Sequence, residues 1–372
     1  MARVTGGTVV VVDDSTVQRR FLRAAVEAGE EFVVVGEARN GREAVALVAR
    51  LRPTVVVMDL DLPVMGGIEA IERIMSATPT PILVCSGFVA GIDSANALAA
   101  LAAGAVDVLP KPAPDDGGTL EDYGHRLRRA LRVASRVRVI THPRGRLRSQ
   151  GTPSTPIVTG DRRPLAGCPE SADDRDDPRG TVKLIAVGAS TGGPQALLTL
   201  LSELPADLTQ AVLVVQHMAE GFVPGLASWL DELVPLPVVV GGSGRRLAPG
   251  TVTIAPSGGN LLVQDERLRV LCVPPDPGQF HVPGVDATFR SVARALGPDA
   301  VGVLLTGMGR DGAAGLLEMR QTGALTLGQD EASSTVYGMP AAAFALHAVE
   351  RQLPLDQMAS AVLAAVGRTV VR

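Results

Sequence analysis

Short apolar runs alternate with amphipathic segments along the first 110 residues of the chain. The runs are rich in β-branched residues and predict strands, whereas the segments between them repeat their apolar positions with helical spacing. The predicted strands cover residues 8–12, 54–58, 81–85 and 105–109. Strands that alternate with helices form βαβ units, so the first part of the chain is predicted to contain a parallel sheet.

The same alternation returns after residue 180. Apolar runs at 184–187, 211–215 and 301–305 predict strands, and helical patterns are expected at 194–204, 222–234, 286–296 and 312–322. The predicted fold class is therefore α/β, with two doubly wound parallel-sheet domains.

The two halves are separated by a segment of different composition. Residues from about 136 to 180 are rich in Pro, Gly, Ser, Thr, Arg and Asp, and they show neither aromatic residues nor apolar periodicity. Such a composition is typical of a flexible linker. We therefore expect a first domain at 8–126, a linker at 127–180 and a second domain at 181–372.

The overall composition is that of a globular protein, with 46% hydrophobic and 20% charged residues. The net charge of −4 gives no general attraction to nucleic acid or anionic lipid. No apolar run approaches the about 20 residues that span a bilayer, so we expect a cytoplasmic protein without membrane insertion. The cysteines Cys85, Cys168 and Cys272 are odd in number and far apart, which argues against a disulfide framework.

Nine arginines fall between Arg126 and Arg148, a density that can bind phosphate backbones. No aromatic residue accompanies them to provide a stacking platform for bases. A solvated helix end that leads into the linker is the better interpretation, and no nucleic-acid partner is expected.

Polar residues follow the predicted strands of the first domain. They are Asp13 and Asp14 after the first strand, then Asp59, Ser86 and Lys111 after later ones. Function collects at the carboxyl ends of parallel strands, where three converging carboxylates would repel one another unless a cation such as Mg²⁺ lay among them. Lys111 is one of only two lysines in a chain that otherwise uses arginine, and its compact ammonium group suits a phosphoryl group.

This order of acidic pair, single aspartate, hydroxyl residue and Lys-Pro resembles the receiver domain of two-component response regulators over residues 8–126. The resemblance implies a flavodoxin-like fold that needs Mg²⁺ for phosphorylation. The implied roles are phosphoacceptor for Asp59, metal ligands for Asp13, Asp14 and Asp59, and switch residues for Ser86 and Lys111. One position departs from the family, because Val108 stands where an aromatic switch residue is usual.

In the second domain, the residues after the predicted strands are Ser190, His217 and Asp311. A serine hydroxyl becomes a nucleophile when an imidazole, itself oriented by a carboxylate, takes its proton, so these residues can form a catalytic triad. Ser190 lies in Gly188-Ala189-Ser190-Thr191-Gly192, which has the G-x-S-x-G spacing of a strand-to-helix turn. Backbone amides at the start of such a helix can face a developing oxyanion.

Two other histidines are candidate bases. The chain order of α/β-hydrolases, Ser-Asp-His, would be met by Ser190, Asp311 and His347. We disfavour His347, because it lies in the Ala-rich stretch 341–349, which is predicted to be helical. His281 lies in a predicted loop, where a residue lining the cleft is the better interpretation. Only His217 lies at a predicted strand end.

The second domain also resembles the catalytic domain of the chemotaxis protein-glutamate methylesterase family. The resemblance is carried by the segments 188–194, 216–218, 305–313 and 337–340. It implies a Rossmann-like domain in which Ser190 is the nucleophile, His217 the general base and Asp311 the residue that orients it. It further implies the amide of Met308 as an oxyanion donor, and we expect Thr191 to provide another.

For the whole chain, this resemblance implies phosphorylation-activated hydrolysis of glutamate methyl esters and deamidation of specific glutamines, for sensory adaptation. The implied partners are the cytoplasmic helices of methyl-accepting chemoreceptors and a chemotaxis histidine kinase, and the esterase is expected to need no cofactor. One segment departs from the family, because Val282 and Gly284 replace the usual Arg and Ser. A docking module without turnover is the alternative function, which the intact Ser190, His217 and Asp311 disfavour.

Overall fold

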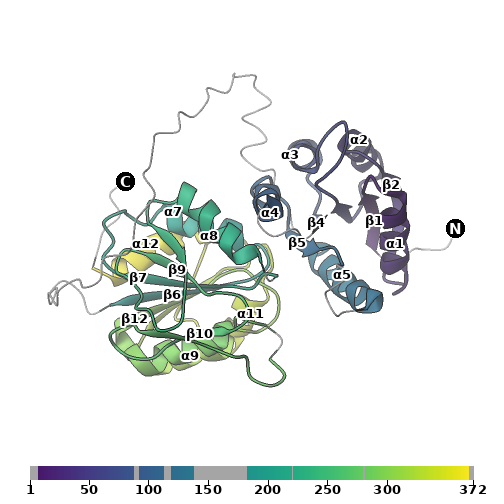
Figure 1. The fold of residues 1–372 in the computed structure, drawn as a ribbon. Coiled ribbons are helices and arrows are strands. Elements are labelled where there is room, and N and C mark those ends of the chain that lie inside the picture. Colours follow the sequence, from purple (N-terminus) through teal and green to yellow (C-terminus); the bar gives the residue numbers. More distant parts are fainter. Residues whose placement is uncertain are drawn as a thin grey trace.

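The computed structural model describes residues 7–87, 92–112, 119–137, 182–219, 221–279 and 281–367, which form two α/β domains in contact (Figure 1). In the first domain a five-stranded parallel sheet has the order β2-β1-β3-β4-β5. Its strands are β1 (Gly7–Val12), β2 (Phe32–Ala38), β3 (Val55–Met58), β4 (Ile82–Ser86) and β5 (Asp107–Pro110). Its helices are α1 (Thr16–Glu27), α2 (Gly41–Leu51), α3 (Gly67–Ala77), α4 (Ile92–Ala102) and α5 (Leu120–Ala134).

The two faces of this sheet are covered by different helices. In β1, Val10 and Val12 point into the cluster formed with α2, α3 and α4, whereas Val9 and Val11 point toward α1 and α5. All four valines are fully buried. A strand covered on both faces reads as an uninterrupted apolar run, which is why β1 was predictable from the sequence.

Helix α5 continues past residue 126, where the linker was expected to begin. It starts with a capping box between Thr119 and Asp122. Its apolar stripe then runs on through Leu127 and Leu131, which are fully buried in the cluster that includes α1. Residues 127–134 are therefore part of a packed helix, and residues 138–180 of the expected linker lie outside the described residues.

The second domain is built on a seven-stranded parallel sheet with the order β14-β13-β12-β6-β7-β9-β8, and β10 and β11 form a separate antiparallel hairpin. The strands are β6 (Leu184–Ala189), β7 (Ala211–Gln216), β8 (Val238–Val240), β9 (Val252–Ile254), β10 (Asn260–Val263), β11 (Val270–Val273), β12 (Ala300–Leu304), β13 (Leu325–Gln329) and β14 (Arg351–Leu353). The helices are α7 (Gly193–Ser202), α8 (Phe222–Leu233), α9 (Val285–Leu296), α10 (Ala313–Gln321), α11 (Met339–Ala345) and α12 (Leu355–Ala365), with a short 3-10 helix at Gly297–Asp299.

Helices again cover both faces of this sheet, with α7, α8 and α12 on one side and α9 and α11 on the other (Figure 1). The expected α/β class with two doubly wound parallel sheets is thus confirmed. Strands β2, β8, β9, β13 and β14 and the hairpin were not among the predicted elements. No helix in the described ranges is long and apolar enough to cross a bilayer.

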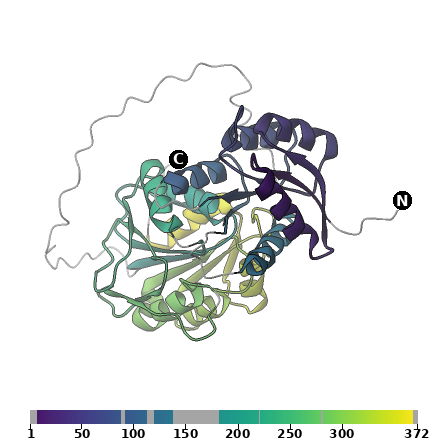
Figure 2. The same ribbon diagram turned by 45° about the vertical axis from the view of Figure 1, so that its right-hand side comes forward.

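The two domains meet through α4, which packs against α7 and α8 (Figures 1 and 2). One apolar cluster runs continuously from the α2–α3–α4 side of the first domain into the α7–α8–α12 side of the second. Gln195 of α7 adds a polar contact, since its Nε2 donates to the carbonyl oxygen of Leu101 at 3.0 Å. On the other side of the contact, Val336 packs against the cluster that contains α5.

The packing of α5 predicts a difference between two leucines of that helix. Leu127 is fully buried and Leu120 is 63% exposed. Leu127→Ala should lower the free energy of unfolding of the first domain by about 2–5 kcal/mol, whereas Leu120→Ala should change it by less than about 0.5 kcal/mol. Urea unfolding followed by far-UV circular dichroism measures the change, and the fluorescence of Trp229, the only tryptophan, follows the second domain separately. Equal effects of the two substitutions would show that α5 is not packed as described.

Candidate functional site

An acidic pocket lies at the carboxyl edge of the first sheet. β1 and β3 are neighbours, with Val12 paired to Met58, so Asp13 and Asp14 leave one strand beside Asp59, which leaves the other. One carboxylate oxygen from each of the three aspartates lies within 4.8 Å of the others. Asp13 and Asp59 are buried, and Asp14 is exposed. A set of carboxylate oxygens this compact, open on one side, fits the donor preference of Mg²⁺.

Lys111 reaches into this pocket. Its Nζ lies 2.8 Å from Oδ2 of Asp13 and 2.9 Å from Oδ2 of Asp59. Burial raises the pKa of Asp59, although the neighbouring Lys111 opposes the shift. Burial alone would lower the pKa of Lys111, but the hydrogen bonds to both carboxylates raise it overall. Ser86 ends the adjacent strand β4, and among the described residues its hydroxyl makes one long contact, of 3.5 Å, with the carbonyl oxygen of Gly87.

In the second domain, Ser190 follows the central strand β6. Ala189 pairs with Gln216 of β7, so Ser190 and His217 are the next residues on neighbouring strands, whose backbones lie about 4.8 Å apart. The side-chain amide of Gln216 donates 2.8 Å hydrogen bonds to the carbonyl oxygens of both residues. This buried amide holds the two turns together. No structural role was predicted for Gln216, although a polar residue at the end of an otherwise apolar strand was a signal in the sequence.

His217 and Asp311 are joined by a 2.8 Å hydrogen bond between Nε2 and Oδ2. The Asp311 carboxylate also accepts hydrogen bonds from the first amides of α9, those of Val285 at 2.8 Å and Asp286 at 2.9 Å. Burial alone would raise the pKa of Asp311, but the hydrogen bond from His217 lowers it overall. Nδ1 of His217 is buried and has no hydrogen-bond partner among the described residues. One ring nitrogen is therefore held by a carboxylate, and the other is available to take a proton.

Two backbone amides near Ser190 are available as donors. Within the described ranges, the amides of Thr191 and Met308 find no acceptor. Thr191 directly follows Ser190, and Met308 follows Gly307, where a Cβ atom would lie 2.7 Å from Cβ of Ser190. Only glycine therefore allows the Met308 loop to approach the serine this closely. Unpaired amides beside a nucleophile can stabilise an oxyanion.

The other candidate histidines lie in different settings. His281 stacks on His217, with ring centroids 4.5 Å apart and an angle of 8° between the rings, so it contacts the candidate base rather than only lining a cleft. His347 is exposed and has a left-handed φ of 56°. Its carbonyl oxygen accepts a hydrogen bond from Arg320. The expectation that His347 lies within a helix is wrong, because α11 ends before it.

Val282 and Gly284, which differ from the residues usual in the family, lie beside a hydrogen-bond network formed by Asn260 and Gln279. The amide of Gly284 donates to Oδ1 of Asn260 at 2.8 Å, and a Cβ atom at this position would overlap the side-chain amide of Gln279. A serine here would therefore displace Gln279. Val282 and Pro283 are joined by a cis peptide bond.

The first domain contacts the second directly beside Ser190. Oγ1 of Thr191 donates a 3.0 Å hydrogen bond to Oδ2 of Asp107 in β5. Asp107 and Val108 also line a cavity of only about 30 Å³ whose far wall includes His217. Val108, at the position of the usual aromatic switch residue, therefore faces the second domain.

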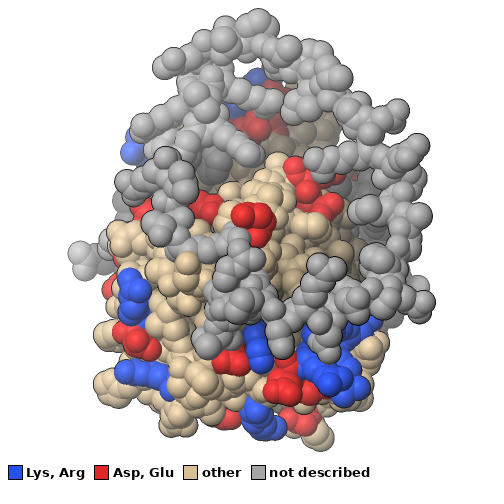
Figure 3. All heavy atoms as spheres, turned by 90° about the vertical axis from the view of Figure 1, so that its left-hand side faces the viewer, with Lys and Arg blue, Asp and Glu red and all other residues tan. Residues whose placement is uncertain are grey.

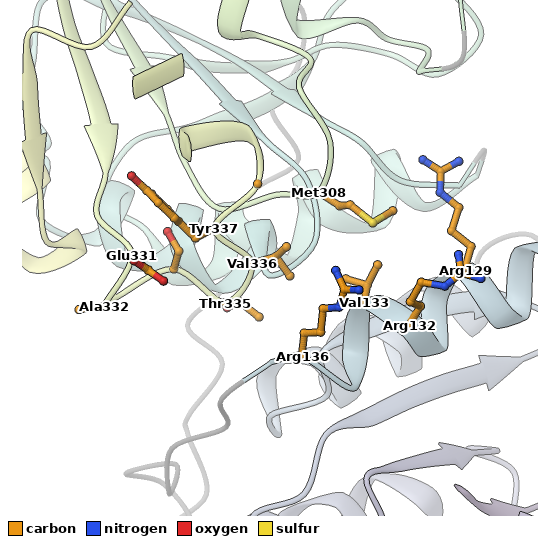
Figure 4. A pocket seen from close by; sticks show the side chains of 12 residues that line it. Arg129, Arg132, Val133, Arg136, Met308, Glu331, Ala332, Thr335, Val336 and Tyr337 are labelled. Atoms are coloured by element: carbon orange, nitrogen blue, oxygen red, sulfur yellow. The ribbon is translucent and has the colours of Figure 1, made fainter. Parts of the chain in front are cut away.

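A larger cleft of about 1100 Å³ opens between α5 and the loop that carries Met308 (Figure 4). Arginines of α5 and of the turn that follows it line one wall, and a segment of the second domain lines the other. These residues include Arg129, Arg132, Arg136, Glu331, Thr335, Val336 and Tyr337. Three of the nine arginines near the expected linker thus line this cleft, Arg129 and Arg132 on α5 and Arg136 just beyond its end.

Charged side chains on the outer face of the second domain are mixed in sign. In Figure 3, basic and acidic residues alternate along the lower part of this face, with uncharged surface between them. The part of this face that the structure describes therefore presents no extended field of one sign to a polyanion.

Both domains match known families. A family model described as response regulator receiver domain matches residues 9–119, and one described as CheB methylesterase matches residues 185–362. A protein of Paramagnetospirillum magneticum named protein-glutamate methylesterase/protein-glutamine glutaminase 3 is 42% identical over 363 residues, which cover 98% of this chain and 97% of that protein. A Myxococcus xanthus protein of the same name, with the number 4, is 42% identical over 96% of each chain. The solved catalytic domain of a Thermotoga maritima CheB methylesterase is 30% identical and covers 49% of this chain and 97% of its own, with a TM-score of 0.47.

The acidic pocket predicts a single phosphate-accepting residue. With a small phosphodonor such as acetyl phosphate, the protein should incorporate phosphate only when Mg²⁺ is present, and Asp59→Asn should abolish incorporation. The control is Asp61→Asn, which removes a nearby exposed carboxylate and should leave labelling intact. Radiolabel or intact mass measures the product. Labelling that persists in Asp59→Asn would move the acceptor to Asp13, Asp14 or Asp61.

Proposed function

Because the chain belongs to the family of protein-glutamate methylesterases/protein-glutamine glutaminases with a receiver domain, we propose that it hydrolyses glutamate methyl esters and deamidates specific glutamines on methyl-accepting chemoreceptors. The products are glutamate with methanol or ammonia. The observation that carries the proposal is the hydrogen bond from His217 to Asp311, which leaves the other imidazole nitrogen free at the strand end next to Ser190. The substrate helices are cytoplasmic, so we propose that the enzyme acts there.

In the proposed reaction, Oγ of Ser190 attacks the ester carbonyl carbon while its proton passes to Nδ1 of His217. The oxyanion that forms accepts hydrogen bonds from the amides of Thr191 and Met308. Collapse of this intermediate breaks the ester bond, and His217 returns the proton to the departing methoxide. Water, deprotonated by the same nitrogen, then attacks the acyl group on Ser190 and releases glutamate.

The two nitrogens of the imidazole have exchanged roles relative to the usual serine triad. In the usual triad the carboxylate binds Nδ1, and Nε2 is the base. Here Asp311 binds Nε2, so its hydrogen bond fixes the proton there and leaves the lone pair on Nδ1. The charge on Asp311 also stabilises the imidazolium that forms. The chemistry is unchanged, because either ring nitrogen can act as the base once a carboxylate has fixed the other.

We propose that a chemotaxis histidine kinase phosphorylates Asp59. Asp13, Asp14 and Asp59 would hold Mg²⁺, which when bound neutralises charge on the phosphoryl group. Lys111 already contacts Asp59 and would pair with the added phosphate. The Ser86 hydroxyl makes a long, weak hydrogen bond to the carbonyl oxygen of Gly87, so it could turn toward the phosphoryl oxygens.

The same proposal assigns an inhibitory role to the unphosphorylated receiver. Its β5 is hydrogen-bonded to Thr191, next to the nucleophile, and leaves only a small cavity against His217. A receptor helix therefore has no access from this side. Phosphorylation adds roughly two negative charges at Asp59 and favours a receiver surface that fits the esterase less well, so activity rises.

Removal of a triad member should abolish turnover. Ser190→Ala or His217→Ala is expected to lower the rate of methanol release from methylated receptor by about 10⁴-fold or more, because nucleophile and base act as one unit. The control His347→Ala removes an exposed histidine and should leave the rate nearly unchanged. Loss of activity in His347→Ala with normal turnover in His217→Ala would instead support the hydrolase chain order. A wild-type protein that binds receptor without releasing methanol would support the docking module.

The inhibitory role predicts the effect of removing the receiver. The segment 181–372 should release methanol faster than the unphosphorylated whole protein, and a phosphodonor should accelerate only the whole protein. Trp229 fluorescence checks that the segment is folded. If truncation leaves the rate unchanged or lowers it, the receiver is not an inhibitory lid and would act by bringing the enzyme to the receptors.

A further inference from the structure

The imidazole of His281 covers one face of the proposed base. The two rings are nearly parallel, at 8°, with centroids 4.5 Å apart. This distance and angle are those of stacked aromatic rings. His281 neither donates nor accepts a proton in the proposed reaction.

The loop that carries His281 is held by the side-chain amides of Asn260, which is buried, and Gln279, which is half-buried. Nε2 of Gln279 donates to the carbonyl oxygen of His281 at 2.6 Å. Gln279 and Asn260 exchange two side-chain hydrogen bonds of 2.8 and 2.9 Å, and Asn260 is only 3% exposed. Asn260 also accepts from the amide of Gly284, on the other side of the loop. Both ends of the loop are therefore tied to one network, which keeps the ring of His281 against His217.

The surroundings of His281 favour its neutral form. Burial and then the nearby His217 lower the pKa of His281, Arg129 of the receiver acts in the same direction, and Asp311 alone opposes them. A neutral imidazole next to His217 adds no charge that would compete for the proton from Ser190. It instead presents an aromatic face to the imidazolium that forms when His217 accepts that proton.

We propose that His281 is a positioning residue, whose ring face holds His217 in the plane set by Asp311 and contacts the imidazolium formed during attack. This proposal rests on the proposed triad and adds a residue to it. Asp311 fixes one edge of the imidazole through Nε2, but a single hydrogen bond leaves the ring free to tilt about that edge. Stacking restricts the tilt and keeps Nδ1 directed to one side. The property required of residue 281 is therefore an aromatic face, and not a nitrogen that takes up protons.

Two variants of the full-length protein separate these properties. His281→Phe keeps an aromatic face without a titratable nitrogen, and His281→Leu keeps apolar volume without the face. We expect His281→Phe to retain kcat for methanol release within about twofold, and His281→Leu to lower kcat by about five- to tenfold with little change in KM. Trp229 fluorescence and thermal unfolding check that both variants fold.

A second measurement makes the test independent of the receptor substrate. The rate at which a fluorophosphonate probe labels Ser190 reports activation of the serine by its base, and it should follow the same order, with Ser190→Ala as the unlabelled control. If wild type is labelled no faster than Ser190→Ala, the triad itself is refuted. If wild type is labelled and both variants equal it, the positioning role is refuted and the triad stands. If His281→Phe is as impaired as His281→Leu, or more so, a ring nitrogen is needed and the positioning role is equally refuted.

Discussion

The geometry of parallel strands determines where this protein can carry out chemistry. In each sheet, the strands that follow the first strand are added on one side of it, and later strands are added on its other side. At the point where the order reverses, the loops after two neighbouring strands lead to opposite faces of the sheet. In the receiver these strands are β1 and β3, followed by Asp13 and Asp59. In the second domain they are β6 and β12, which lead to Ser190 and Asp311. Both sites therefore occupy the one crevice that their topology leaves open.

Asp311 forms hydrogen bonds both to His217 and to the start of helix α9. Its carboxylate receives the first amides of α9 as well as His217, so the positive end of a helix and the candidate base share one anion. The close approach depends on two glycines, because a Cβ atom on Gly188 or Gly312 would overlap Val285 at the start of that helix. The packing of α9 against Gly188 and Gly312 therefore also places the amides that bind Asp311, and Asp311 in turn binds the imidazole of His217.

Strands β1, β6 and β7 were predicted from apolar runs, and the central residues of each are buried on both faces. Burial is not the whole explanation, because β5 was also predicted although its residues are only half-buried. Strand β2 has Gly36 and Glu37 in its second half, and β14 is a three-residue edge strand with two exposed residues, so neither has the continuous apolar pattern that local analysis detects. Ser190, His217 and Asp311 were predicted from the sequence as residues that follow strands, and in the structure His217 is hydrogen-bonded to Asp311. The sequence could not place His281 on His217, because that contact depends on Asn260, which begins β10, and on Gln279 in the loop before α9, and the two share no local sequence pattern.

Strand β5 joins the acidic pocket of the receiver to the contact between the domains. Lys111 contacts both buried carboxylates of the acidic pocket, and its amide donates to the carbonyl oxygen of Ser86 at 2.8 Å. Four residues earlier, at the other end of β5, the half-buried carboxylate of Asp107 accepts a hydrogen bond from the hydroxyl of Thr191. If a phosphoryl group on Asp59 displaced Lys111, the displacement would act on a strand whose other end is hydrogen-bonded to the turn that carries Ser190. Because the bond is made by Asp107 and not by residue 108, this path does not require the aromatic switch residue that Val108 replaces.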